Sequence, residues 1–109
     1  MAGFDLIVAG AGPAGLAAAA LAAQGGKRVA LVSGPPTASE DPRTVALMQP
    51  SVNLLNHLGP WPGRLMQHAS PLKRLRLVDD TGYLVTAPEM VFEASEIGAE
   101  WFGWNVPVA

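Results

Sequence analysis

The 109-residue chain contains no cysteine and only two histidines. The absence of cysteine excludes a disulfide-stapled secreted scaffold, thiolate metal sites and a cysteine nucleophile. Charged residues make up 15% of the chain, and seven basic against nine acidic residues leave a formal net charge of -2. Because nucleic-acid binding needs a basic face, we predict no nucleic-acid partner. Half of the residues are hydrophobic, which is enough for one small domain.

One uncharged run, residues 6–23, has nearly the length of a transmembrane span. The residues before it include no lysine or arginine, and residues 10–15 of the run contain three glycines and a proline. Both features disfavour the alternatives of a signal peptide and a membrane anchor. The run also divides into a short apolar segment that ends at Ala9 and an Ala/Leu-rich segment that begins at Leu16. We therefore predict no integral membrane span.

The N-terminal third of the chain shows the pattern of a βαβ unit. Residues 4–9 are apolar except for Asp5, a pattern that is typical of a strand covered on both faces. Residues 14–24 predict a helix, apolar almost all round, that Gly25 and Gly26 end with a left-handed C-cap. Residues 29–32 predict a second apolar strand. The order strand, helix, strand indicates a parallel, Rossmann-like α/β unit.

The turn between the first strand and the helix carries the motif with the clearest chemistry. Its residues are Gly10, Ala11, Gly12, Pro13, Ala14 and Gly15, a G-x-G-x-x-G sequence. Gly10 permits a tight turn, Gly12 lets a pyrophosphate approach the backbone, and Gly15 lets the helix pack close to the strand. The helix N-terminus then offers free N–H groups to phosphate oxygens. The motif predicts dinucleotide binding; the alternative is a glycine-rich turn that closes an ordinary βα unit.

The end of the second strand lacks the acidic residue that usually holds the ribose hydroxyls. Ser33 occupies this place and Gly34 follows it. Ser33 can exchange a hydrogen bond with a hydroxyl group but brings no charge. The sequence therefore predicts weaker binding of the adenosine half of the cofactor.

The remainder of the chain predicts smaller elements. Residues 34–42 indicate a loop, and residues 50–58 predict a helix that Gly59 ends. Residues 73–78 and 83–86 predict the two strands of a hairpin, joined by a turn at residues 79–82 and exposed on one side. After Pro88 the pattern predicts no clear element. Four glutamates at spacings of three and four, Glu89, Glu93, Glu96 and Glu100, are consistent with one solvated helix face.

Several motifs together resemble the start of the FAD-dependent aromatic hydroxylases. The resemblance is carried by Gly10–Gly15 with Pro13, by Asp41–Leu47, Ser51–Leu55 and Leu58–Trp61, and later by Ser70–Leu72, Val78–Gly82, Ala87–Glu89, Glu96–Gly98 and Phe102–Asn105. The branch that the chain resembles most is that of the ubiquinone-biosynthesis hydroxylases of the 2-octaprenyl-6-methoxyphenol type, relatives of para-hydroxybenzoate hydroxylase. The resemblance covers nearly the whole chain.

This resemblance implies an FAD-dependent monooxygenase that uses NAD(P)H and dioxygen to hydroxylate an aromatic ring. Arg43 matches the family's arginine that lies along the bound FAD; the alternative is a solvated loop cation. It also implies a cytoplasmic protein that can associate peripherally with a membrane through a lipophilic quinone substrate. Whether NADH or NADPH is the reductant stays open.

The enzymes of this family are several times longer than 109 residues, and no Gly-Asp pair like theirs occurs here. We therefore expect a fold that is incomplete relative to the family: a Rossmann-like βαβ dinucleotide-binding unit with an added β-hairpin. Residues 1–70 would form the FAD-binding segment and residues 71–109 the start of the substrate-domain hairpin region. As this fragment the chain is expected to be inactive and to form a homo-oligomer through exposed strand edges. The alternative is a non-catalytic dinucleotide-binding or oligomerising module.

Overall fold

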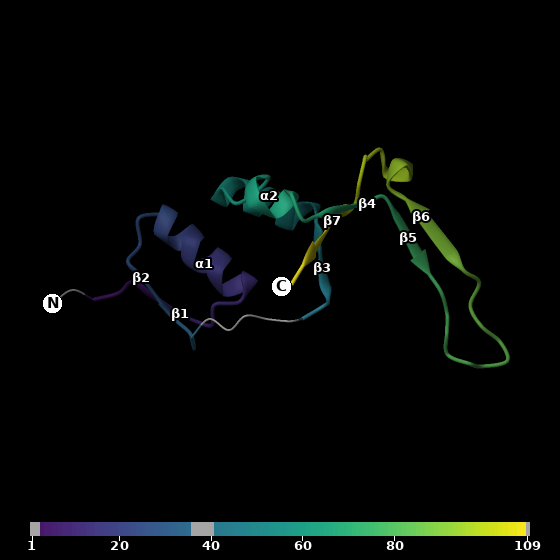
Figure 1. Ribbon diagram of the computed structural model, residues 1–109, viewed down its shortest axis with the longest axis horizontal. Helices are drawn as coiled ribbons and strands as arrows, with labels where there is room; N and C mark the ends of the chain where they lie inside the picture. Colours follow the sequence, from purple (N-terminus) through teal and green to yellow (C-terminus); the bar gives the residue numbers. More distant parts are fainter. Residues whose placement is uncertain (1–2, 36–40, 109) are drawn as a thin grey trace.

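The computed structural model describes residues 3–35 and 41–108. It begins with the predicted βαβ unit: β1 (Leu6–Ala9), α1 (Pro13–Gln24) and β2 (Val29–Val32). The two strands pair in parallel, with Leu6 opposite Val29, and α1 packs against both (Figure 1). Gly25 ends the helix and Gly26 follows with a φ of 76°, so the predicted left-handed turn is confirmed at Gly26. The predicted α/β class is confirmed.

A second sheet joins segments that lie far apart in the sequence. Its three antiparallel strands have the order β3 (Thr44–Met48), β7 (Gly103–Pro107), β4 (Ser70–Leu72). Helix α2 (Gln49–Leu58) continues directly from β3 and packs against β3 and β7, and the short helix α3 (Gly63–Met66) follows. Gly59 adopts a φ of 106° at the end of α2, as the sequence predicted. The predicted helix is therefore confirmed, one residue longer at its start.

The buried core of the described residues is small. It contains only Val52 of α2, Trp61 and Ala94. The Trp61 and Trp104 rings meet edge to face with centroids 5.4 Å apart, and Trp101 lies 5.9 Å from Trp104. Aromatic pairs of this kind add stability beyond the area that they bury. The three tryptophans thus join the α2–α3 connection to β7.

The remaining strands form an arm that projects from this core. Strands β5 (Arg74–Leu77) and β6 (Met90–Glu93) pair in antiparallel fashion, with Arg74 opposite Glu93. Arg74 forms an ion pair with Glu93, and Arg76 forms one with Glu89 at 2.7 Å between Nε and Oε1. The 3₁₀ turn η1 (Ala94–Ile97) follows β6 at the base of the arm. Figure 1 shows the arm on the side of the molecule opposite to α1.

The structure corrects the predicted hairpin. Its first strand is confirmed as β5, but residues 83–86 are not a strand, and the partner strand is β6 instead. The turn is also wider than residues 79–82. The Asp79 carboxylate accepts hydrogen bonds from the backbone N–H groups of Thr81, at 3.1 Å, and Ala87, at 2.8 Å. These bonds hold the chain in a broad loop. Pairing of the two strands therefore begins only at Leu77 and Met90, next to the ion pair between Arg76 and Glu89.

The prediction that the four glutamates share one helix face was wrong. Glu89 precedes β6 and Glu93 ends it, where both pair with arginines of β5. Glu96 lies in η1, and its side chain accepts a hydrogen bond from the Glu93 N–H in a capping box. Strands β3, β4 and β7 were not predicted from the sequence, and part of the predicted loop 34–42 lies outside the described residues.

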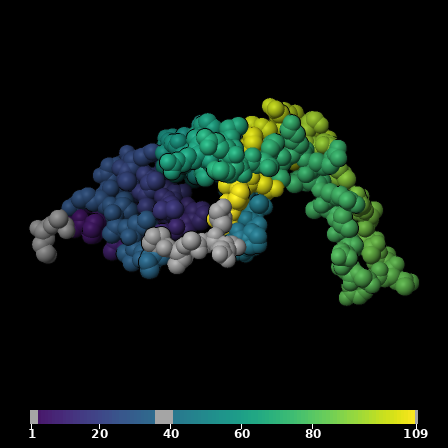
Figure 2. All heavy atoms as spheres, in the orientation of Figure 1, coloured from purple at the N-terminus to yellow at the C-terminus, as the bar shows by residue number. Residues whose placement is uncertain are grey.

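The chain is elongated, with principal extents of 66 × 32 × 24 Å. Its radius of gyration is 18.5 Å, against about 13 Å for a compact chain of this length. In the space-filling view the arm extends well beyond the rest of the molecule (Figure 2). Many large apolar side chains therefore stay exposed, among them Ile7 of β1, Val32 of β2 and Leu16 of α1.

The pairing of β3 with β7 generates a first prediction about stability. A Cβ atom at Gly103 would lie 2.2 Å from the Leu47 carbonyl oxygen and 2.8 Å from the Met48 Cα. We expect Gly103→Ala to lower the free energy of unfolding by about 1–3 kcal/mol, because backbone would have to shift. Urea unfolding followed by tryptophan fluorescence measures this. Gly63→Ala, where a Cβ meets nothing within 4 Å, is the matched control; equal effects of both changes would contradict the prediction.

A second prediction concerns the acid sensitivity of the arm loop. The N–H of Ala87, and then Thr81, hold the pKa of Asp79 below its usual range. The pKa of Asp79 is thus lower in the folded chain than in the unfolded chain, so its carboxylate stabilises the loop fully above about pH 3.9. This stabilisation is lost as the pH falls through the pKa of the folded chain. The amide NMR signals of Ala87 and Thr81 should then titrate together at acid pH. The change should disappear in Asp79→Asn and persist in Asp80→Asn; the reverse result would refute the role of Asp79.

Candidate cofactor site

The G-x-G-x-x-G turn leaves β1 at Ala9 and enters α1 at Pro13. Gly10 has a φ of 109°, a conformation that side-chain-bearing residues rarely adopt. Its N–H donates a 2.8 Å hydrogen bond to the Val32 carbonyl oxygen at the end of β2. The turn is therefore fixed to the carboxyl edge of both strands, which is where ligands bind in parallel α/β sheets.

The second and third glycines of the motif have different surroundings. A Cβ atom at Gly15 would lie 2.0 Å from the Gly10 carbonyl oxygen, so the helix approaches the strand too closely for any side chain. A Cβ atom at Gly12 would meet nothing within 4 Å. The space beside Gly12 is thus open, as it must be if a phosphate is to approach the backbone. The geometry fits the separate roles that the motif predicted for these two glycines.

The start of α1 is suited to an anion. Gly12 is the N-cap, with extended backbone and no side-chain capping bond, and Pro13 has no N–H to satisfy. The N–H groups of Ala14 and Gly15 have no acceptor within the helix, because the first turn of any helix lacks one. No acidic side chain lies in this turn. The N–H groups and the positive end of the helix dipole therefore face the open space beside Gly12 and Ala11.

Ser33 lies at the same sheet edge, directly after the residue that accepts the Gly10 hydrogen bond. Its hydroxyl donates to the Gly34 carbonyl oxygen at 3.0 Å, which leaves the oxygen lone pairs available as acceptors. The structure thus places Ser33 at the same sheet edge as Gly10. The exposed side chain carries no charge, so it offers only a neutral hydrogen bond to a cofactor hydroxyl.

Arg43 lies on the other connection, one residue before β3. Its exposed guanidinium pairs with Asp41, with Nε 2.8 Å from Oδ1 and 3.0 Å from Oδ2. The pair lowers the pKa of Asp41, chiefly through the arginine side chain, and raises that of Arg43. The Arg43 carbonyl oxygen accepts the Val108 N–H at 3.0 Å, which ties this connection to the end of β7.

The start of α1 and the second sheet face each other across an apolar groove of about 580 Å³. Pro13 and Leu16 of α1 line one side, and Val45 of β3 and Val106 of β7 line the other. The sequence analysis missed this groove because it predicted neither strand. The alternation of Trp104 and Val106 with polar or small neighbours was the one local signal for β7, and it is short.

Residues 3–35 and 41–108 contain no cluster of three or more histidine, aspartate or glutamate side chains that could hold a metal ion. Within the same residues, no helix is both long enough and apolar enough to cross a membrane.

Comparison with known proteins identifies the family of the chain. A comparison with curated proteins gave no match. The family model of the FAD binding domain matches residues 4–92, which is most of the chain and includes the whole βαβ unit. The open, uncapped helix start beside Gly12 fits the pyrophosphate of such a cofactor. The chain therefore belongs to the FAD-binding-domain family, and FAD is its cofactor.

Proposed function

We propose that the chain is the FAD-binding segment of a flavin-dependent aromatic-ring hydroxylase of the ubiquinone-biosynthesis type. The observation that carries the proposal is the start of α1, where an open Gly12 and uncapped N–H groups lie at the carboxyl edge of a parallel strand pair. FAD, when bound, would pass electrons from NAD(P)H to dioxygen. The sequence motifs after residue 41 support the hydroxylase branch of the family.

The proposal gives each site residue a role. Gly10, Ala11, Gly12, Pro13, Ala14 and Gly15 form the turn that holds the pyrophosphate. Ser33 would hydrogen-bond to a ribose hydroxyl at the end of β2, and its neutral hydroxyl supports a modest contribution to affinity. Arg43 would lie along the cofactor. Its pairing with Asp41 supports this, because the carboxylate orients the guanidinium before the cofactor arrives.

We further propose that this chain does not hydroxylate a substrate by itself. A catalytic site needs polar groups that are held in place and shielded from water, so that they stabilise developing charge. No polar or charged residue among residues 3–35 and 41–108 is buried. The described residues thus supply a phosphate-binding turn without an enclosed reaction site. The family resemblance of the motifs before and after residue 70 supports the proposed division into an FAD-binding segment, residues 1–70, and the start of a substrate-domain region, residues 71–109, of a longer enzyme.

The other part of the proposal concerns partners and location. Exposed strand edges of β1–β2 and of the arm support self-association, because unpaired N–H and C=O groups favour pairing with another chain. A lipophilic quinone substrate would give a cytoplasmic enzyme of this type a peripheral contact with the membrane. The second candidate is a non-catalytic dinucleotide-binding or oligomerising module, which is equally consistent with the finding that no polar or charged residue is classed as buried in the described part of the chain.

The two glycines of the motif provide a test of the FAD site. Gly12→Val fills the open space and should weaken FAD binding at least tenfold while leaving the circular dichroism spectrum unchanged. Gly15→Ala forces a clash with Gly10 and should reduce both FAD binding and stability. Flavin fluorescence titration measures affinity. Gly63→Val, which also meets open space, is the control for a larger side chain. Unchanged FAD affinity in Gly12→Val would argue against the site.

The lack of catalysis is tested separately. The purified chain with FAD should oxidise NAD(P)H no faster in the presence of a phenolic substrate than in its absence, with no hydroxylated product detected by mass spectrometry. One hydroxylated product per NAD(P)H consumed would overturn this part of the proposal. The chain can also be joined to the remaining domains of a hydroxylase. If that fusion binds FAD but hydroxylates no substrate, the result would favour the second candidate, the non-catalytic dinucleotide-binding module.

A further inference from the structure

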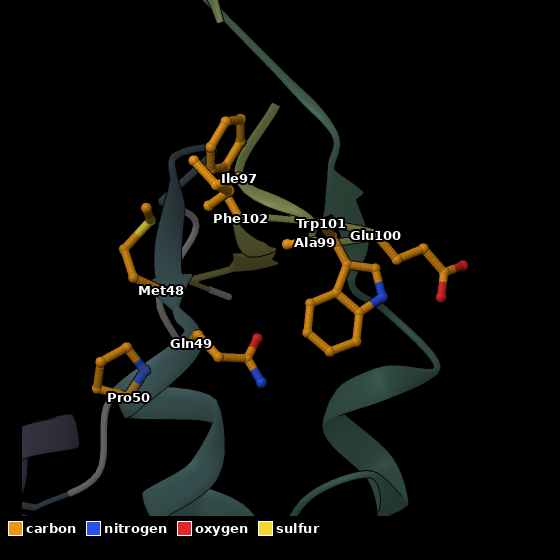
Figure 3. A pocket seen from close by; sticks show the side chains of 8 residues that line it. All are labelled: Met48, Gln49, Pro50, Ile97, Ala99, Glu100, Trp101 and Phe102. Atoms are coloured by element: carbon orange, nitrogen blue, oxygen red, sulfur yellow. The ribbon is translucent and has the colours of Figure 1, made fainter. Parts of the chain in front are cut away.

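A cleft of about 500 Å³ lies at the base of the arm, and none of its lining residues belongs to the G-x-G-x-x-G turn. Figure 3 shows its walls, which come from the β3–α2 junction and from the segment after η1. Most are apolar or aromatic: Met48, Pro50, Ile97, Trp101 and Phe102. No basic residue lines it, and the Glu100 carboxylate points away from it (Figure 3). The cleft therefore suits a neutral aromatic group.

One polar atom in this cleft has no partner. The Gln49 side chain donates from Nε2 to the Asn53 Oδ1 at 3.1 Å, which fixes the amide at the start of α2. Its Oε1 is buried and accepts no hydrogen bond, the single such side-chain atom in residues 3–35 and 41–108. The amide points toward the Trp101 ring (Figure 3). A buried acceptor without a donor is unfavourable, so the site favours an occupant that brings an O–H or N–H group.

The tip of the arm carries a group of this chemistry. Tyr83 is the only tyrosine of the chain and is 76% exposed. Leu84 and Val85 beside it are even more exposed, at 105% and 86%. Asp79 holds the loop that presents them through its bonds to Thr81 and Ala87. The tip is thus an ordered, apolar projection with one neutral O–H donor.

The cleft and the tip lie at opposite ends of the same arm. Strand β6 runs from the tip loop to η1, and the segment that follows η1 lines the cleft. When two arms lie side by side in opposite directions, each tip reaches the base of the other arm. Both contacts are then identical, and a twofold arrangement of this kind closes as a dimer.

The exposed surface is large enough for such a dimer. The chain exposes 8345 Å², against about 5,700 Å² for a compact monomer of 11.3 kDa. The excess is well above the roughly 800 Å² that each partner buries in a standard interface. One face of the arm is also apolar, with Leu75 opposite Phe92 and Leu77 opposite Met90. In the antiparallel arrangement, the arm of the second copy would cover this apolar face.

We propose that two copies of the chain associate through antiparallel arms, and that each places Tyr83 in the cleft of the other. The Tyr83 O–H donates to the Gln49 Oε1, and the ring packs among Trp101 and Phe102. Because the oxygen is covered in the free chain, Gln49 or Trp101, both half-buried, changes rotamer when the ring enters. This assignment goes beyond FAD binding and supplies the specific contact for self-association.

Cross-linking tests the proposed contact directly, because the chain has no cysteine of its own. Tyr83→Cys mixed with Gln49→Cys should give a covalent dimer under mild oxidation. Neither variant alone should do so, since equivalent positions lie far apart in the proposed dimer. Tyr83→Cys mixed with Gln67→Cys, an exposed position after α3, is the control. Equal cross-linking in the control, or in Tyr83→Cys alone, would overturn the proposal.

Sedimentation equilibrium over a dilution series tests the hydrogen bond. The chain should reach twice the mass of 11.3 kDa, and Tyr83→Phe and Gln49→Met should each weaken dimerisation by about fivefold. The double variant should be no weaker than either single one, because both remove the same bond. Gln67→Met should leave dimerisation unchanged. A monomer at every concentration, or additive effects of the two variants, would refute the proposal; FAD titration of the same samples reports independently on the FAD site.

Discussion

The approach of Gly15 to the Gly10 carbonyl oxygen is the constraint on which the cofactor end of the molecule depends. A Cβ atom at Gly15 would lie 2.0 Å from that oxygen, so α1 can begin directly over the end of β1 only because the residue is glycine. This contact places the free N–H groups of the first helical turn at the sheet edge, beside the open backbone of Gly12. The same few residues therefore determine both the packing of the helix and the position of the anion site.

A second glycine has the corresponding role in the antiparallel sheet. Gly103 lies under the backbone of Leu47 and Met48, which allows β7 to enter between β3 and β4. Through this pairing, residues near position 45 and residues near position 106 form one surface opposite α1. The helix is apolar on all sides, so it can face the strand pair with one side and this surface with another. Two glycine contacts thus position α1 on the strand pair and β7 within the second sheet.

The βαβ unit could be predicted because its signals are local. Each strand is an unbroken apolar run, and Gly10 and Gly26 adopt the left-handed conformations that turns and helix ends require. The second sheet could not be predicted, because β7 pairs with strands about 30 and 60 residues earlier in the chain. The hairpin failed for a related reason. Residues 83–86 have strand-forming side chains, but the Arg74–Glu93 and Arg76–Glu89 pairs and the Asp79 bonds favour a wider loop. The cleft at Gln49 likewise depends on residues 97–102, which only the fold brings to α2.

The distribution of buried surface makes binding important for this chain. Among the described residues only three apolar side chains are buried, so the hydrophobic contribution to folding is small for 109 residues. Any molecule that binds the folded chain and not the unfolded one adds to its stability by mass action. The anion site lies at the start of α1, and the cleft lies where β3 meets α2, beside the segment that follows η1. The two sites share no residue, so contributions from occupancy at each should add independently. A chain with so little core can therefore be stabilised from both ends without any change in the contacts that connect them.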